Sequence, residues 1–437
     1  MKTLICVLFL TSFLAVLESR VALPNSLIEI LSEIPKLFIE DAEIVGCTID
    51  INKDFKFPEP LLMTHHAEGT KRDFLQPLNN SKGLIHLDSN EEFELHCSHG
   101  FKETFDGKSL KARCLRGTTF VIENRKMTLK EVSCKRNTFH TTQKAGKCKN
   151  NGTLIEIGYE IPSLVPDINN NLEKTFHKLI TTCTDIIRDR TFWSHVTLTA
   201  ANMGKQSGVS RPSFLTGRDH FTSKNLNALY GKNNQIEQLT KLLGTEIAPK
   251  ILVTEKQFLN RGHLTPKADL IMGTGQRATF YFVNVAPQWA SFNSGNWLKI
   301  EESVRQLVAE RDLIADVYTG THGVISYRDI NGTKQEFYLN YDENGNGLIP
   351  VPKIYFKVIV DRKSMKGVAL IGVNNPYVTL KEIKRDYIYC DDVSPEIKWV
   401  RNIQERPSDG YYYACKVPDL AKVVQTLPEL HVTGLLI

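Results

Sequence analysis

The sequence predicts an α+β protein of two or three domains. Its 437 residues exceed one typical domain of about 150 residues. Short alternating apolar runs at residues 84–87, 93–95, 120–122 and 127–132 are typical of half-buried strands. Beyond residue 150, strand-like runs mix with runs at helical spacing, without the regular alternation of a doubly wound fold.

The composition is that of an ordinary globular chain. Hydrophobic residues make up 41% and charged residues 24%, with 27 Gly and 18 Pro. These values exclude collagen-like, low-complexity and wholly disordered proteins.

The first residues predict export. Lys2 precedes an apolar run at residues 4–17, and the small residues Ser19 and Ala22 offer cleavage points, so we interpret residues 1–22 as a signal peptide. The apolar run is shorter than the roughly 20 residues that span a bilayer. We therefore expect a secreted, extracellular protein that does not enter a membrane.

Two domains are expected after this segment. Residues 23–150 hold most of the cysteines and short strands, which favours a small β domain. A stretch rich in Gly, Asn and Lys at residues 144–152 marks the joint, and residues 151–437 form the second domain. In that domain residues 154–159 and 279–283 predict strands, and residues 171–187 and 297–311 predict helices.

The cysteines favour disulfide bonds. Nine are present, and the eight that follow the signal peptide are Cys47, Cys97, Cys114, Cys134, Cys148, Cys183, Cys390 and Cys415. An even number in an exported chain favours disulfides, and eight cysteines allow about 105 connectivities. The pairing stays open, although Cys390 and Cys415 are close enough in sequence to suggest one pair. Asn79, Asn151 and Asn331 lie in sequons that predict glycans.

The basic charge is concentrated in one block. Residues 111–149 hold eleven Lys and Arg against two Glu, although the whole chain has a net charge of only +5. Such a block attracts polyanions such as nucleic acid or heparin by releasing counterions. A solvated surface on a small β domain explains the same composition, and composition alone slightly favours that reading.

The chemically informative window begins with Arg261, Gly262 and His263. In an extended chain the Arg and His side chains point to the same face, with Gly as a flexible point between them. A neighbouring guanidinium disfavours protonation of the imidazole, which suits a neutral base. Together the two groups could activate water and stabilise an oxyanion. Alone, a short surface loop would explain the tripeptide better.

A helix is expected to start near Asn293. Apolar residues at Trp297, Ile300, Val304 and Val308 have helical spacing. Asn293 then falls on the buried stripe and Glu301 at its edge, where an unpaired polar group is unfavourable. Mg²⁺ would explain both, because it takes oxygen ligands and needs few protein groups. A helix N-cap and a surface charge are the simpler alternatives.

At these positions the sequence resembles the DNA/RNA non-specific endonucleases. These are ββα-metal (His-Me finger) nucleases related to the secreted Serratia enzyme and to endonuclease G, and the likeness is greatest to secreted arthropod members, including salivary nucleases of blood-feeding flies. It covers about residues 150–437. The motifs that carry it are RPSF (211–214), NRGH (260–263), NVAPQW (284–289), FNSGNW (292–297), TGTHG (319–323), VNNPY (373–377) and GYYYAC (410–415).

The resemblance implies roles for the basic residues. His263 matches the general base that activates the attacking water, and Arg261 matches the arginine that supports the scissile phosphate. Arg211 of RPSF matches an upstream phosphate-binding arginine more loosely. The implied substrates are DNA and RNA, double- or single-stranded, cut without sequence specificity because phosphate contacts do not read bases.

The resemblance also implies a metal site. Asn293 matches the single protein ligand of Mg²⁺, for which Mn²⁺ could substitute, and Glu301 matches the carboxylate that holds the metal's water ligands. Asn284 matches a further active-site asparagine. The implied reaction is in-line hydrolysis that leaves a 5′-phosphate.

One residue departs from the family pattern. The usual motif is DRGH, and Asn260 replaces the Asp, which weakens any charge-assisted bond at that position. Secreted arthropod members often lack that Asp, so its absence does not imply loss of activity. A separate alternative function is a salivary nucleic-acid-binding protein with weak or vestigial nuclease activity. A third is a haemostatic or immune interaction protein whose nuclease fold is incidental. The oligomeric state stays open.

Other motifs receive structural interpretations. Residues 342–347 start like a calcium-binding loop, but Lys353 occupies the position that needs a bidentate Glu, so a hairpin loop is expected. Trp289 and Trp297 are expected in the core. His322 is expected to pack or to hydrogen-bond.

Overall fold

The computed structural model describes residues 46–437 except 65–71, 80, 103–104, 163–173, 219 and 252–253. The predicted signal peptide lies outside these residues. All described residues belong to one compact unit, Gly46–Ile437. In this part of the chain no helix has the length and apolar character that a membrane span requires.

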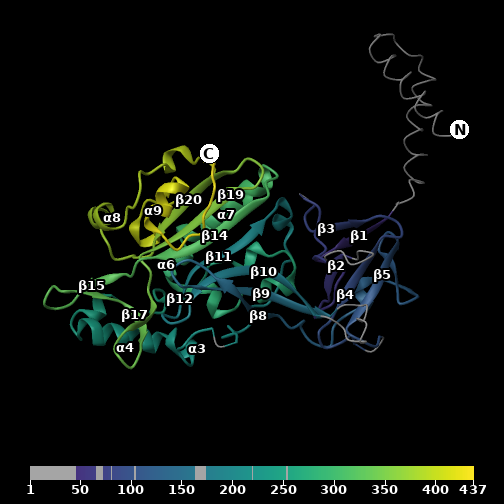
Figure 1. The fold of residues 1–437 in the computed structure, drawn as a ribbon, viewed down its shortest axis with the longest axis horizontal. Coiled ribbons are helices and arrows are strands. Elements are labelled where there is room, and N and C mark those ends of the chain that lie inside the picture. Colours follow the sequence, from purple (N-terminus) through teal and green to yellow (C-terminus); the bar gives the residue numbers. More distant parts are fainter. Residues whose placement is uncertain are drawn as a thin grey trace, which may run out of the picture. The chain divides into compact units, whose positions relative to one another are not determined.

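The first strands form two small sheets within this unit, which together are called the β domain below (Figure 1). Strand β1 pairs with β3, and a separate sheet has the order β2-β4-β5-β6-β7. Their bounds are β1 (Cys47–Asp50), β2 (Leu61–Thr64), β3 (Leu84–Leu87), β4 (Glu92–His96), β5 (Ser109–Arg116), β6 (Thr119–Ile122) and β7 (Arg125–Met127). The strands expected at residues 84–87, 93–95 and 120–122 are thus confirmed.

The strand expected at residues 127–132 is wrong. Strand β7 ends at Met127, and a 3₁₀ turn, η1 (Leu129–Glu131), follows. The Glu131 carboxylate accepts a hydrogen bond from the Thr128 backbone N–H at 2.8 Å. This capping interaction favours a helical turn over an extended chain.

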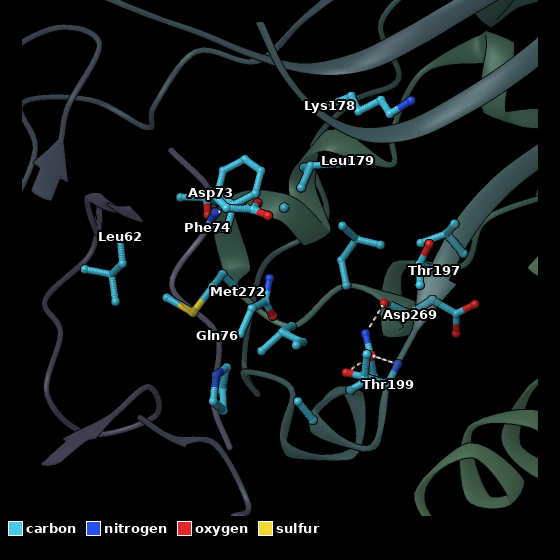
Figure 2. A pocket seen from close by; sticks show the side chains of 18 of the residues that line it. Leu62, Asp73, Phe74, Gln76, Lys178, Leu179, Thr197, Thr199, Asp269 and Met272 are labelled. Atoms are coloured by element: carbon cyan, nitrogen blue, oxygen red, sulfur yellow. Dashed lines mark hydrogen bonds between the residues drawn. The ribbon is translucent and has the colours of Figure 1, made fainter. Parts of the chain in front are cut away.

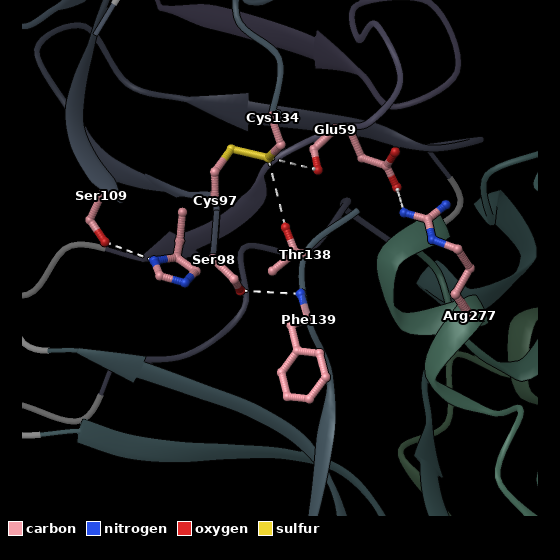
Figure 3. The surroundings of a disulfide bond; sticks show 9 residues. Glu59, Cys97, Ser98, Ser109, Cys134, Thr138, Phe139 and Arg277 are labelled. Carbon is pink, nitrogen blue, oxygen red and sulfur yellow. Dashed lines mark hydrogen bonds and ion pairs between the residues drawn. A yellow bond between two sulfur atoms is a disulfide. The ribbon is translucent and has the colours of Figure 1, made fainter. Parts of the chain in front are cut away.

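Four disulfides join the eight cysteines of the described chain: Cys47–Cys114, Cys97–Cys134, Cys148–Cys183 and Cys390–Cys415. The expected Cys390–Cys415 pair is confirmed. The first two lie within the β domain, and Figure 3 shows Cys97–Cys134. Disulfides persist in oxidising compartments, so this pattern is typical of a secreted protein.

A large sheet dominates the rest of the described chain. Its order is β21-β20-β19-β14-β11-β10-β9-β8, with β22 added beside β20. Neighbours are antiparallel except for β20 and β22. The bounds are β8 (Thr141–Lys147), β9 (Thr153–Pro162), β10 (Lys174–Asp185), β11 (Arg190–Leu198), β14 (Ala315–His322), β19 (Ile354–Asp361), β20 (Lys366–Val373), β21 (Tyr412–Cys415) and β22 (Gly434–Leu435).

Two expected elements in this region are wrong. The helix expected at residues 171–187 is strand β10 in its described part, because β-branched residues alternate between the faces of the sheet. In place of the strand expected at residues 279–283, residues 279–281 connect α5 (Gly273–Ala278) to η5 (Phe282–Asn284), and η5 takes the last two expected strand positions. The strands expected at 154–159 and the helix expected at 297–311 are confirmed as β9 and α7 (Asn296–Glu310).

Helices cover both faces of the large sheet. Trp297 and Ile300 of α7 pack on one face, in a core that includes Val317 and Ile359. On the opposite face, α8 (Leu380–Asp386) and α9 (Val417–Val423) pack on alternate residues of the same strands, such as Val358. Trp289 and Trp297 have 0% exposed area, which confirms their place in the core.

Shorter elements connect these layers. The expected hairpin around Asp342 is confirmed, and its carboxylate accepts bonds from the backbone of Asn344 and Asn346. His322 packs its ring against Tyr389. The connecting elements are η2 (Ala200–Gly204), α3 (Leu226–Leu229), α4 (Lys232–Leu243), η3 (Ala248–Lys250), β15 (Ser326–Arg328), β16 (Lys334–Glu336), β17 (Tyr338–Tyr341), β18 (Gly347–Pro350), η6 (Ser394–Glu396) and η7 (Pro407–Asp409).

Candidate active site

Two strands and a helix form the frame of the site. Strand β12 (Leu259–His263) pairs antiparallel with β13 (Val285–Trp289), so that Gly262 lies opposite Ala286. Helix α6 (Ala290–Asn293) and then α7 follow β13 directly. This ββα unit carries the residues of the NRGH and FNSGNW motifs.

Gly262 is required for close packing. A Cβ atom at this position would lie 2.3 Å from the Gln288 Oε1 and 2.8 Å from the Tyr355 hydroxyl. We expected the glycine to supply flexibility, and that reason is wrong. Its lack of a side chain lets β12 approach β13 and the large sheet, which fixes the two residues beside it.

The start of α7 is held by Asn296. Its carboxamide donates to the carbonyls of Gln404 and Gly410 at 2.8 and 2.7 Å, and it accepts from the Gln404 N–H at 2.8 Å. These bonds tie the FNSGNW motif to the segment before β21. Asn293, three residues earlier, ends α6 and stays half-buried.

A cavity of about 660 Å³ opens beside this frame. Five of the six predicted site residues line it: Arg211, Arg261, His263, Asn293 and Glu301. They come from a loop, from β12, from α6 and from α7, so the fold brings together positions up to 90 residues apart. The sixth, Asn284, does not line the cavity.

His263 lies between two aromatic rings. Its ring centroid is 5.2 Å from that of Phe214 and 4.8 Å from that of Phe280. The Nε2 atom is buried and has no hydrogen-bond partner among the described residues. Burial, together with the charges of Arg211 and Lys267, lowers the pKa of His263 to about 3. We expected Arg261 to be that cation, which is wrong.

Arg261 is held by rings and by a backbone carbonyl. Its guanidinium lies 5.6 Å from the ring centroids of both Phe214 and Tyr230, which favours a cation–π contact. It also donates to the Asn227 carbonyl at 2.8 Å. Burial lowers the pKa of Arg261, but a guanidinium remains charged at neutral pH.

The Asn284 side chain makes its hydrogen bonds outside the cavity. Its Oδ1 accepts from the Ser194 hydroxyl at 2.9 Å and from the Thr265 N–H at 3.0 Å. Its Nδ2 donates to the carbonyls of Thr265 and Thr279. The side chain has 0% exposed area. Asn284 therefore holds the segment that follows His263, and the structure does not bring it to the other predicted residues.

Asn293 and Glu301 present free oxygens to the cavity. No hydrogen bond or ion pair within the described part uses either side chain, and burial raises the pKa of Glu301 to about 7. The described residues contain no group of three His, Cys, Asp or Glu side chains placed for a metal. One amide and one carboxylate suit Mg²⁺, which keeps several water ligands and binds through few protein groups. The residues therefore fit the metal that the sequence predicted.

Further cations line the same cavity, and the sequence did not predict them. They are Lys205, Lys267 and Arg305. Arg305 lies four residues after Glu301 on α7, so helical spacing could have identified it. Lys205 and Lys267 carry no motif, and only the fold places them here. With Arg211 and Arg261 they make the cavity strongly cationic.

Similarity to a protein family identifies the kind of protein that carries this cavity. The family model of the DNA/RNA non-specific endonucleases matches residues 160–420, more than half of the chain. The chain belongs to this family. The match covers the ββα frame and all six predicted site residues.

Individual relatives of this endonuclease agree. A salivary endonuclease of Lutzomyia longipalpis is 28% identical over 379 residues, covering 83% of this chain and 80% of the relative. The salivary protein Tsal2A of Glossina morsitans morsitans is 23% identical over 413 residues, covering 91% of this chain and 97% of that protein. A nuclease of Serratia marcescens is 31% identical over 104 residues, which cover 23% of this chain and 34% of that protein.

Membership makes the chain a nuclease-type hydrolase with an α+β, ββα-metal domain. The family acts on DNA and RNA, and its members generally depend on a divalent metal. The expected fold and family are thus confirmed.

Proposed function

We propose that this protein is a secreted, Mg²⁺-dependent endonuclease that hydrolyses phosphodiester bonds of DNA and RNA and leaves 5′-phosphates. The single observation that carries the proposal is the cavity that His263, Asn293 and Glu301 line together with three arginines. A base, oxygen atoms for a metal and its water ligands, and a set of cations are the groups that metal-dependent phosphodiester hydrolysis needs.

His263 is proposed to act as the general base. Its imidazole is neutral above about pH 3, and the buried Nε2 is free to accept a proton from water. A pKa of about 3 is low for efficient base catalysis. The negative phosphate of a bound substrate would raise it, because an opposite charge nearby favours the protonated form.

The cations are proposed to bind the substrate backbone. Arg261 is fixed by Phe214, Tyr230 and Asn227, so its remaining donors are preorganised toward the scissile phosphate. Arg211 is exposed and would bind a phosphate along the strand. Such contacts position any nucleic acid without reading its bases.

Asn293 would bind the metal directly, and Glu301 would hold its water ligands. Mg²⁺ bound there would supply a Lewis acid that stabilises the negative charge of the phosphorane-like transition state. Mn²⁺ would be able to replace it, because it accepts the same oxygen ligands.

The disulfides and the salivary relatives support export into saliva. All eight cysteines of residues 46–437 are paired, as is typical of an oxidising compartment. Two of the relatives named above are described as salivary. The proposed substrates are therefore extracellular nucleic acids.

A second candidate is a nucleic-acid-binding protein with weak catalysis. The observation that favours it is the basic block at residues 111–149, in which every Lys and Arg except the half-buried Arg113 is exposed. This surface adds phosphate contacts that need no chemistry, and its affinity would fall steeply with salt.

One experiment separates the two candidates. Purified protein is incubated with supercoiled plasmid or with RNA, in Mg²⁺ or in EDTA, beside the His263→Ala variant. Cutting that needs Mg²⁺ and falls about 10²- to 10⁴-fold in the variant is expected for the enzyme. If the protein binds nucleic acid in a gel shift but wild type cuts no faster than the variant, the enzyme proposal is wrong. The nucleic-acid-binding function is then the remaining candidate.

A further inference from the structure

One wall of the active-site cavity is a loop, residues 205–211, that also contacts the β domain. Among the described residues, those lining the cavity begin at Lys205, so the β domain does not line it. Residues 205–211 follow η2 and supply Lys205, Gln206, Ser207, Gly208 and Arg211 to the cavity. The other side of this loop contacts the β domain.

The first contact is made by Asn52, just after β1. Its Oδ1 accepts hydrogen bonds from the Ser207 N–H at 2.8 Å and from the Ser207 hydroxyl at 2.9 Å. Asn52 is itself held, since its N–H donates to the Asp50 carboxylate at 2.9 Å. Beside it the two backbones touch: a Cβ on Gly204 would lie 2.3 Å from the Gly83 nitrogen.

The second contact is a buried ion pair. Arg277 of α5 donates to the Glu59 carboxylate at 2.8 Å, and both side chains are at most 6% exposed (Figure 3). The same carboxylate packs closely against Gly273. A Cβ atom at Gly273 would lie 2.8 Å from Glu59 Oε1 and 2.7 Å from Gln206 Oε1. The Gly273 N–H donates to that Gln206 oxygen at 2.6 Å. The β domain, α5 and the loop therefore meet at one point.

The third contact is a shared core. Ala201 and Ile271 pack into the hydrophobic core of the β domain, although both belong to the second domain. Beside them lies a cavity of about 520 Å³ with Leu62 on one side and Thr197 and Asp269 on the other (Figure 2). Two of its lining residues are joined by a hydrogen bond, in which Asn202 donates to the Asp269 carbonyl at 2.7 Å.

Arg211 lies at the end of this loop. No hydrogen bond or ion pair within the described chain involves its exposed side chain. Its place is set by the loop, which Gln276 fixes through the Gln206 carbonyl and Lys267 through the Val209 carbonyl. Those two bonds come from the second domain, and Asn52 supplies the matching bonds from the β domain.

We propose that the β domain positions the substrate-binding wall of the cavity, with Asn52 as the positioning residue that orders residues 205–211 and so places Arg211 against the nucleic-acid backbone. This rests on the proposed function, because it assigns Arg211 to substrate. Asn52 is exposed, so truncating it removes no core packing. The expected effect is on binding of the nucleic acid and not on the proton transfer at His263.

The test compares Asn52→Ala with Asn52→Asp, which keeps an acceptor oxygen, and with Ser98→Ala. Ser98 is a matched control: its hydroxyl accepts from the Phe139 N–H at 3.2 Å, far along the chain from the loop (Figure 3). Four quantities are measured: amide exchange of residues 205–211, affinity for a short DNA duplex in EDTA, and kcat and KM in Mg²⁺.

Asn52→Ala is expected to speed exchange of residues 205–211, to weaken affinity and raise KM about three- to tenfold, and to leave kcat within twofold. Asn52→Asp should keep slow exchange, and Ser98→Ala should match wild type throughout. Exchange or affinity of Asn52→Ala equal to that of Ser98→Ala would overturn the inference, as would a loss of kcat alone. If wild type binds DNA but does not cut it, the proposed nuclease activity fails, while exchange and affinity still decide the role of Asn52.

Discussion

Arg305 and Asp269 form a buried ion pair that joins two walls of the active-site cavity. The guanidinium of Arg305 lies 2.6 Å from the Asp269 carboxylate, and the side chains are only 6% and 3% exposed. Arg305 stands one helical turn after Glu301, and Asp269 ends η4 (Lys267–Asp269), which begins with the cavity residue Lys267. The pair therefore fixes the distance between the proposed metal site and the cationic wall.

Asp269→Asn is expected to lower the free energy of unfolding by about 3–5 kcal/mol, because it leaves the Arg305 cation buried without its counter-charge. Urea unfolding measures the loss. Asp419→Asn is the control: Asp419 pairs with Lys422 at the surface, at 2.7 Å, and exposed pairs contribute about 0–1 kcal/mol. Equal losses in the two variants would contradict a stabilising role for the buried pair.

The raised pKa of Glu301 predicts how stability depends on pH without metal. Burial raises this pKa from 4.5 to about 7, so the folded protein takes up a proton between these values. Stability from Glu301 is then fully present below about pH 4.5 and is lost as pH rises through about 7. In EDTA, Glu301→Gln should exceed wild type in free energy of unfolding by more at pH 8 than at pH 5.

Mg²⁺ supplies the control for this prediction. A bound cation favours the ionised carboxylate, so the advantage of Glu301→Gln at pH 8 should shrink or reverse in saturating Mg²⁺. A difference that is the same at both pH values would show that Glu301 titrates normally in the folded protein.

Lys357 is expected to set the acid limb of the pH–rate profile. It is buried on β19, donates to the Thr319 hydroxyl at 2.6 Å, and its positive charge lowers the pKa of Glu301. Lys357→Met should raise that pKa, so that activity falls at least about tenfold at pH 6 and little at pH 9. Lys353→Met, just before the same strand, should leave the profile unchanged. Identical profiles for wild type and Lys357→Met would remove Lys357 from the site.

Five of the six predicted site residues line the cavity, and they could be predicted because the motifs that carry them are local. His263 and Arg261 share one strand, and Glu301 lies on a helix with clear apolar spacing. Each assignment needs only the period of a strand or of a helix. The cations Lys205 and Lys267 were missed because nothing in their neighbours marks them. They reach the cavity through contacts between residues distant in sequence, which periodicity does not encode.

The wrong elements have a related cause. Residues 171–187 mix polar and apolar positions in a way that also fits an amphipathic helix, but β9 and β11 pair with both sides of β10 and stabilise the strand. Gly262 could not be understood from the sequence either. Its role depends on Gln288 and Tyr355, which reach it from 26 and 93 residues away.

Asn284 is expected to act through the position of its neighbours and not by touching the substrate. In Asn284→Asp the carboxylate keeps the bonds from Ser194 and Thr265, but it faces the carbonyls of Thr265 and Thr279 without a donor. Leaving buried groups unsatisfied should lower the free energy of unfolding by at least about 2 kcal/mol. Activity should fall as well, because His263 lies beside the displaced segment.

Measuring both Tm and activity of the same variants tests this role. His263→Ala is the comparison, since it should remove activity with little change in Tm. Asn284→Asp should lower both, and total activity should recover in part on cooling below its Tm, because a larger fraction of the molecules is then folded. A variant that keeps the wild-type Tm and loses only kcat would instead place Asn284 among the residues that contact the substrate.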